Sequence, residues 1–278
     1  MGIRIAAFAD EASATLEGQI RAMERNGIRL LEIRQVETKN ISALTRREAR
    51  QVRERLEEKG MEVWSVGSPT GKIRLGDPFR PHFDAFRHQL ELANVLGAAH
   101  YRLFSFYDTG DSDSAFDEVC DRLSRMLEAA KGSGVILCHE NEKEIFGDRV
   151  DRCLRLLTAL PELKAVFDPA NFLQCGEAAL PAWERLAPFV EYLHIKDCDA
   201  AGRVVPPGRG VGDLKEILTR YAAAGGGTVT LEPHLSGFVG LAALENGQKS
   251  RSAYSFKNGD EAFDAAAGAL KELLEGIV

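Results

Sequence analysis

The sequence predicts a (β/α)8 TIM barrel, in which eight parallel strands are surrounded by helices. Three observations support this fold. Short β-rich segments alternate with longer amphipathic segments from residue 3 to the end of the chain, which is typical of β/α units. Eight such units can be counted, and 278 residues suit one barrel. No linker or low-complexity segment interrupts the pattern, so we expect a single domain over residues 1–278.

The eight predicted strands are short and rich in aliphatic, aromatic and β-branched residues. In a parallel barrel their C-terminal ends share one rim, where TIM barrels carry their active sites. The last four strands each end on a side chain that can bind a metal. The strands are expected at Ile3–Ala9, Leu30–Arg34, Glu62–Ser68, Tyr101–Phe106, Val135–Glu140, Leu163–Asp168, Val190–Asp197 and Thr228–Glu232.

The predicted helices are recognised by capping residues followed by apolar positions at helical spacing. Thr45 and Glu48 form the spacing of a capping box, in which each side chain satisfies a backbone N–H group at the helix start. Glycine follows several of the apolar stripes and ends the helix. The helix starts are expected at Thr15, Thr45, Asp77 to Phe79, Ser114, Asp148, Asp213 and Asp260.

The composition indicates a water-soluble globular protein. Hydrophobic residues make up 45% and charged residues 28% of the chain, which is ordinary for this class. A formal net charge of −7 argues against nucleic-acid binding, because neutralising phosphates requires clustered Lys and Arg. Five cysteines without a C-x-x-C pair argue against a disulfide framework. The first residues lack the apolar stretch of a signal peptide or membrane span, so we expect a cytoplasmic protein without a membrane partner.

Four strand-end residues are the candidate metal ligands: Glu140, Asp168, His194 and Glu232. Three carboxylates and one imidazole suit Mn²⁺, Mg²⁺ or Co²⁺, and zinc also accepts such ligands. Without a cation, carboxylates brought this close would raise each other's proton affinity. One acidic residue at a strand end is commonly a helix cap, and a lone histidine is commonly a core residue. The coincidence of four favours a catalytic metal centre.

The motifs around these residues resemble the xylose isomerase-like TIM barrels, especially the sugar phosphate isomerase/epimerase group. The resemblance rests on CHENE, FDPANF, YLHIKD and LEPH, and it covers essentially the whole chain. It implies one divalent metal ion, with Mn²⁺ as first choice and Mg²⁺, Co²⁺ or Zn²⁺ as alternatives. The implied ligands are Glu140, Asp168, His194 and Glu232.

The resemblance also implies a reaction. Glu140 and Glu232 would move a proton on and off a carbon next to a carbonyl, while the metal stabilises the charge of an enediolate. Lys196 would add positive charge near the enolate or a phosphate. Asp197 would hold Lys196 in place or cap the following loop. Glu140, Glu232 and Lys196 are therefore the expected catalytic residues.

Five residues are candidate substrate contacts. Asn171 and His234 lie beside the ligands in the motifs. Trp64 and Lys72 come from the first half of the chain, where Lys72 could bind a carboxylate or phosphate, although an exposed lysine in a turn is the preferred explanation. Arg209 lies in PPGRGVGD, a helix-entry segment whose backbone N–H groups could bind an anion. Relatives often carry an acidic residue in this segment, which puts its role in doubt.

Neighbouring residues receive weaker assignments. Strand alternation turns His139 away from Glu140, and Glu142 and Glu144 are expected to be solvated. Glu32 and Arg34 could line the pocket. The alternation of Arg102 and Phe104 with Tyr101 and Leu103 leaves open which set faces the barrel interior.

The preferred function is a metal-dependent isomerase or epimerase of a small sugar, keto-sugar or sugar phosphate. A keto-inositol or keto-sugar dehydratase needs the same enolisation and is the alternative. A zinc endonuclease of the endonuclease IV type would require a richer histidine set than six residues supply, and a barrel that binds sugar without catalysis is the remaining hypothesis. A homodimer or homotetramer stays open, with the long loop at residues 233–259 as a candidate lid or subunit contact.

Overall fold

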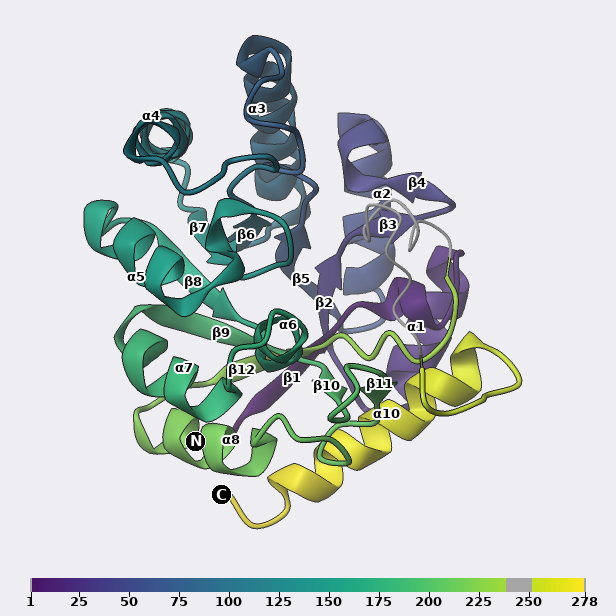
Figure 1. The fold of residues 1–278 in the computed structure, drawn as a ribbon. Helices are drawn as coiled ribbons and strands as arrows, with labels where there is room; N and C mark the ends of the chain where they lie inside the picture. The colour runs from purple at the N-terminus through teal and green to yellow at the C-terminus, as the bar shows by residue number, and fades with distance from the viewer. Residues whose placement is uncertain (1, 239–251, 278) are drawn as a thin grey trace.

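The computed structural model of the protein describes residues 2–238 and 252–277. Eight parallel strands close into a barrel in the order β1-β12-β9-β8-β7-β6-β5-β2. The helices form a ring around these strands (Figure 1). The predicted (β/α)8 TIM barrel is confirmed. Residues 239–251 of the loop expected to act as a lid or subunit contact lie outside the described residues.

The barrel strands overlap all eight predicted segments. They are β1 (Arg4–Ala7), β2 (Leu30–Ile33), β5 (Glu62–Gly67), β6 (His100–Leu103), β7 (Ile136–Glu140), β8 (Lys164–Phe167), β9 (Val190–Ile195) and β12 (Thr228–Leu231). Two short antiparallel ladders join β3 (Gln35–Val36) to β4 (Lys39–Asn40) and β10 (Asp197–Cys198) to β11 (Val204–Val205).

The helices connect consecutive barrel strands and cover their outer faces. The α-helices are α1 (Leu16–Arg25), α2 (Arg46–Glu57), α3 (Phe79–Leu96), α4 (Asp113–Ala130), α5 (Val150–Ala159), α6 (Pro169–Gln174), α7 (Ala179–Leu186), α8 (Leu214–Ala223) and α10 (Gly259–Leu274). Short 3-10 turns are η1 (Ala9–Glu11), η2 (Ile41–Ala43), η3 (Phe146–Asp148) and η4 (Ala187–Phe189).

The helix starts follow the predicted capping rules with three exceptions. The capping box at Thr45 is present. Helix α4 is capped by Ser112, so Ser114 lies inside its first turn. Asp148 belongs to η3 instead of opening α5. Asp213 occupies the N-cap position of α8 but makes no capping hydrogen bond, because its backbone adopts a left-handed conformation with φ 52°.

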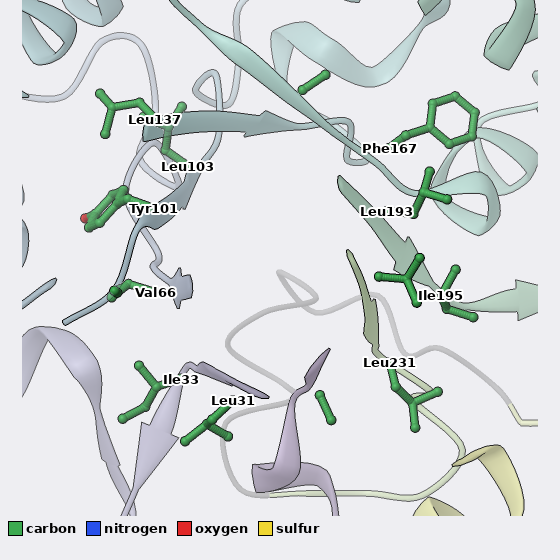
Figure 2. Packing of buried hydrophobic residues seen from close by; sticks show 14 of the residues in the cluster. Leu31, Ile33, Val66, Tyr101, Leu103, Leu137, Phe167, Leu193, Ile195 and Leu231 are labelled. Atoms are coloured by element: carbon green, nitrogen blue, oxygen red, sulfur yellow. The ribbon is translucent and has the colours of Figure 1, made fainter. Parts of the chain in front are cut away.

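Apolar residues of the strands form the core between barrel and helices. Figure 2 shows Leu31, Tyr101, Leu137 and Leu193 pointing away from the barrel axis toward the surrounding helices. Because side chains alternate along a strand, the residues between them point inward. Tyr101 reaches Gln89 of α3 through its hydroxyl group. Arg102, the next residue of β6, therefore faces the barrel interior. The sequence alone had left open whether Tyr101 or Arg102 does so.

The barrel interior is strongly polar toward its C-terminal end. Glu32, Ser65, Arg102, Tyr192 and His194 are all at most 1% exposed. Buried charges are tolerated only when they are paired or hydrogen-bonded, so these side chains must satisfy one another or a ligand. The inward-facing strand residues thus build a site instead of a purely apolar core.

Two further features bear on the expectations from composition. All five cysteines are free thiols, which agrees with the prediction of no disulfide framework. Among the described residues, no helix combines the length and the apolar character needed to cross a bilayer.

Candidate active site

The four predicted ligands meet at the C-terminal rim of the barrel. Glu140 ends β7, His194 lies in β9, and Asp168 and Glu232 directly follow β8 and β12. All four are buried, and one potential ligand atom from each lies within 4.8 Å of the others. Nδ1 of His194 is 3.1 Å from Oε1 of Glu140 and 3.3 Å from Oε2 of Glu232. Residues separated by up to 92 positions in sequence thus form one cluster.

The cluster has the properties that a divalent cation requires. Nδ1 of His194 is buried without a hydrogen bond of regular geometry, and Oδ2 of Asp168 contacts the Lys196 ammonium as an ion pair. Burial raises the pKa of Asp168 to about 6, and the charges of Glu140 and Glu232 add to this effect although Lys196 opposes it. A cation would satisfy Nδ1 of His194 and relieve the repulsion between the carboxylates. The donor set, three carboxylates and one imidazole, therefore fits a metal ion.

Lys196 lies against two of these carboxylates. Its Nζ atom is 2.8 Å from Oδ2 of Asp168 and 3.5 Å from Oε2 of Glu232. Burial alone would lower the pKa of Lys196, but the neighbouring carboxylates outweigh burial and hold that pKa well above its ordinary value. The predicted catalytic lysine is therefore a buried cation at the centre of the site.

A second charged group supports Glu232 from the opposite side. Nη1 of Arg34 is 2.9 Å from Oε1 of Glu232. The same guanidinium donates two hydrogen bonds to Asp10 and one to Glu11, both in η1. Asp10 and Glu11 were missed from the sequence, although an acidic pair directly after the first strand meets the same rim rule that identified the metal ligands.

His234 lies beside the ligands, where the resemblance suggested it. Its backbone N–H donates to Oε2 of Glu11 at 2.7 Å, and its Nε2 atom is 3.4 Å from Oε1 of Glu232. Glu11, Glu232 and His234 could form a second metal-binding group. However, Arg34 pairs with both of these carboxylates and already supplies positive charge. The first cluster, in which four buried ligands converge, is the better metal site.

Glu140 is oriented by an amide and a guanidinium. Nδ2 of Asn171 is 3.2 Å from Oε1 of Glu140, and Nε of Arg102 is 3.2 Å from Oε2. The backbone N–H of Asn171 donates to Oδ1 of Asp168, which caps α6. Asn171 thus contacts two of the four ligands, and its amide is already engaged before any substrate arrives.

Two lysines share one carboxylate near this side of the cluster. Nζ of Lys72 is 3.2 Å from Oε2 of Glu142, and Nζ of Lys143 is 3.1 Å from Oε1. The side chain of Lys72 is 7% exposed and that of Glu142 is 14% exposed. The expectation of a solvated Glu142 is therefore wrong, because the chain folds back over the rim here and pairs it with both lysines. Glu144 is exposed, as expected.

Trp64 and Arg209 are not brought to the cluster. Trp64 stacks on His100, the first residue of β6, at 4.1 Å and lines a cavity of about 520 Å³ with Arg4 and Thr228 at the N-terminal ends of the strands. Arg209 is exposed and pairs with Glu272 of α10. The expectation that these two residues contact the substrate is therefore wrong. Trp64 lies at the opposite end of the barrel, and Arg209 lies on its outer face.

The glycine-rich segment at residues 206–213 does bind an anion, and that anion is the protein's own Asp197. Oδ2 of Asp197 accepts from the backbone N–H groups of Gly208 and Gly210, at 2.9 and 3.0 Å. Oδ1 accepts from Gly212 at 3.1 Å and Cys198 at 2.9 Å. Of the two roles considered for Asp197, the structure supports the capping of the loop.

Comparisons with known proteins agree with this architecture. L-ribulose 3-epimerase superposes with a TM-score of 0.78 at 17% identity, over 100% of this chain and 96% of that chain. The probable 3-DHS dehydratase AsbF from Bacillus anthracis gives 0.74 at 16% identity, over 98% and 99%. The IolI protein with a bound zinc atom gives 0.76 at 13% identity, over 99% of both chains. At these identities the likeness concerns the fold.

Sequence comparison gives the family. No curated protein matches the chain at a significant level. A family model, that of the xylose isomerase-like TIM barrel, matches residues 20–272, which is most of the chain. Together with the closed barrel and the cluster at its rim, this match means that the chain belongs to the xylose isomerase-like TIM barrel family.

Proposed function

We propose that the protein is a divalent-metal-dependent isomerase or epimerase of a small sugar, keto-sugar or sugar phosphate. The observation that carries the proposal is the buried cluster in which two glutamates, Glu140 and Glu232, both lie next to Nδ1 of His194. Such a site can present two carboxylates to one bound substrate. An enzyme with this barrel, L-ribulose 3-epimerase, is among the structural neighbours.

Each residue has a distinct role in this proposal. Glu140, Asp168, His194 and Glu232 would hold the metal, with Mn²⁺ as first choice. When bound, the metal supplies Lewis-acid polarisation of a substrate carbonyl. Glu140 and Glu232 accept and return a proton on the carbon next to that carbonyl. Lys196, held between Asp168 and Glu232, stabilises negative charge that develops on substrate oxygen.

A dehydratase is the second candidate, and the unequal surroundings of the two glutamates favour it. Glu232 faces two basic side chains, Arg34 at Oε1 and Lys196 at Oε2, whereas Glu140 faces one, Arg102. Ion pairing to this extent makes a carboxylate a weaker base. An epimerase needs a proton carrier on each face of the substrate, whereas a dehydratase needs one base and one acid. Glu140 would then be the base.

Solvent exchange distinguishes the two reactions. The metal-loaded protein is incubated in D₂O with unphosphorylated and phosphorylated ketoses and with keto-inositols. An epimerase or isomerase introduces deuterium into the recovered sugar at the carbon next to the carbonyl. A dehydratase releases water and produces an enone absorbance. If no compound shows either change, the proposed reaction class is wrong.

Conservative variants test the catalytic assignment. E140Q and E232Q should each lower turnover by about 10²–10⁴-fold, the usual contribution of a general acid or base. The matched control is E191Q, because Glu191 also pairs with a histidine but lies at the far end of the barrel. Unchanged turnover in both E140Q and E232Q would refute the assignment.

The remaining parts of the proposal concern partners. The substrate is a small carbohydrate, and a homodimer or homotetramer is the expected assembly, which light scattering can measure directly. A zinc endonuclease would need a larger set of histidines, and elemental analysis showing three zinc ions per chain would overturn the sugar-enzyme proposal in its favour.

A further inference from the structure

We propose that Glu32 is a positioning residue for the metal centre, which holds the imidazole of His194 so that Nδ1 faces the other three ligands. The inference rests on the proposed metal site. Glu32 comes from β2 and His194 from β9, which are not neighbours in the barrel. Their contact therefore crosses the barrel interior.

The hydrogen-bonding chemistry of the pair selects one tautomer. Nε2 of His194 is 3.2 Å from Oε2 of Glu32, and both side chains are 0% exposed. An ionised carboxylate can only accept a hydrogen bond, so Nε2 must carry the proton. In a neutral imidazole, Nδ1 is then the atom with the free lone pair. That same atom faces the ligand cluster, 3.1 Å from Oε1 of Glu140.

Other buried groups prevent Glu32 from turning away. Its second oxygen, Oε1, accepts from the hydroxyl of Tyr192 at 2.9 Å and from Ser65 at 3.2 Å. The His194 ring is also held from the side by the ring of Phe8, with centroids 5.2 Å apart and planes at 80°. Both ends of the contact are thus fixed by packing and hydrogen bonds before a metal binds.

A carboxylate that accepts from the second nitrogen of a ligating histidine raises the basicity of the ligand and fixes the ring orientation. Nothing else in the barrel interior offers His194 an anionic acceptor at Nε2 among the described residues. Removing the charge of Glu32 should therefore weaken metal binding although Glu32 does not itself touch the metal.

The chain contains a matched control pair. Oε1 of Glu191 lies 3.1 Å from Nε2 of His100, at the N-terminal end of the barrel. The pair has nearly the same length as that of Glu32 and His194, but in the described part of the chain His100 belongs to no group that could hold a metal. Comparing variants of Glu191 and Glu32 therefore separates two effects. One is the loss of any carboxylate–imidazole contact, and the other is the loss of the contact at the metal centre.

The test measures binding of Mn²⁺ alone and Zn²⁺ alone to the full chain by calorimetry. E32Q should weaken binding of each ion by about 10- to 100-fold, the usual effect of losing such a support, while E191Q should stay within about twofold of the wild type. Unchanged affinity in folded E32Q would overturn the proposal. Thermal unfolding without metal shows whether each variant is folded.

A second measurement uses the wild-type protein, so it does not depend on E32Q folding. Nitrogen NMR of the zinc-loaded, histidine-labelled chain should show His194 protonated at Nε2 and metal-bound at Nδ1. Protonation at Nδ1 would overturn the proposal. If zinc binds in this way but no sugar is converted, the inference stands and the proposed function fails. If neither ion binds the wild type at millimolar concentration, the inference fails.

Discussion

Replacing Asp197 by Asn should strongly destabilise the fold, because its carboxylate is shared by four backbone N–H groups. Each oxygen accepts two of them, at 2.9 to 3.1 Å. In D197N one oxygen becomes an NH₂ group, which cannot accept. Two N–H groups then lose their acceptor and face another donor.

The size of the effect follows from these contacts. A hydrogen bond to a charged group is worth about 1.5–3 kcal/mol. D197N loses two such bonds and removes the charge from the other two, but the N–H groups of Gly208 and Gly210 are only partly buried, so water can replace part of the loss. We expect the free energy of unfolding to fall by about 3 kcal/mol.

Urea denaturation followed by circular dichroism measures this difference. The matched control is D199N, because Asp199 also accepts two backbone N–H groups, from Ala201 and Arg203, but through Oδ1 alone and in solvent-exposed hydrogen bonds. Its loss of stability should be much smaller, since water competes for these bonds. If D197N and D199N unfold at the same urea concentration, the backbone contacts of Asp197 do not stabilise the loop.

Three further predictions concern glycines, a histidine and a tryptophan. In G210A the added Cβ overlaps the Asp197 carboxylate and should lower the free energy of unfolding by about 1–3 kcal/mol. G268A, in α10 with open space around it, should raise the free energy of unfolding by about 0.5–1 kcal/mol. Denaturation midpoints that shift in the same direction for both variants would contradict this prediction. Burial lowers the pKa of His82 from 6.5 to about 4, so its contribution to stability is complete above pH 6.5 and is lost as the pH falls toward 4, by at most about 1.4 kcal/mol per pH unit. H82Q should remove this dependence of the free energy of unfolding on pH in denaturation curves measured from pH 7 to 5. If the dependence is unchanged in H82Q, other groups cause it. W64F should lower the free energy of unfolding while kcat and metal affinity stay within about twofold of the wild type. A large rise in KM would indicate that Trp64 contacts the substrate after all.

The sequence allowed most of the fold, and the convergence of four candidate metal ligands, to be predicted. Strand and helix periodicity defined all eight barrel strands, since burial against the helix ring leaves a regular apolar pattern. Glu140, Asp168, His194 and Glu232 were predictable because the ends of parallel strands converge whatever their separation in sequence. This rule needs only strand boundaries.

Predictions failed where position along a strand or the path of a loop decided the outcome. Trp64 lies three residues before the end of β5, about 10 Å from it, which moves its ring to the other end of the barrel. Arg209 is carried outward because its loop wraps around Asp197. The predicted strand Glu62–Ser68 already placed Trp64 near its start, whereas the path of the Arg209 loop leaves no local pattern in the sequence. Glu142 looked solvated for the same reason, since its lysine partner Lys72 comes from a distant turn.

The polar interior has a consequence for how the protein folds. Arg34 and Glu232 are 198 positions apart, and Glu32 and His194 are 162 apart. Forming such non-local contacts is slow, because a long stretch of chain must be ordered before they are made. Until β12 docks between β1 and β9, Arg34 lacks Glu232, one of its three carboxylate partners, and the cluster lacks one of its four candidate ligands. During refolding, the ability to bind metal should therefore be acquired after most helical structure, when the last strand closes the barrel.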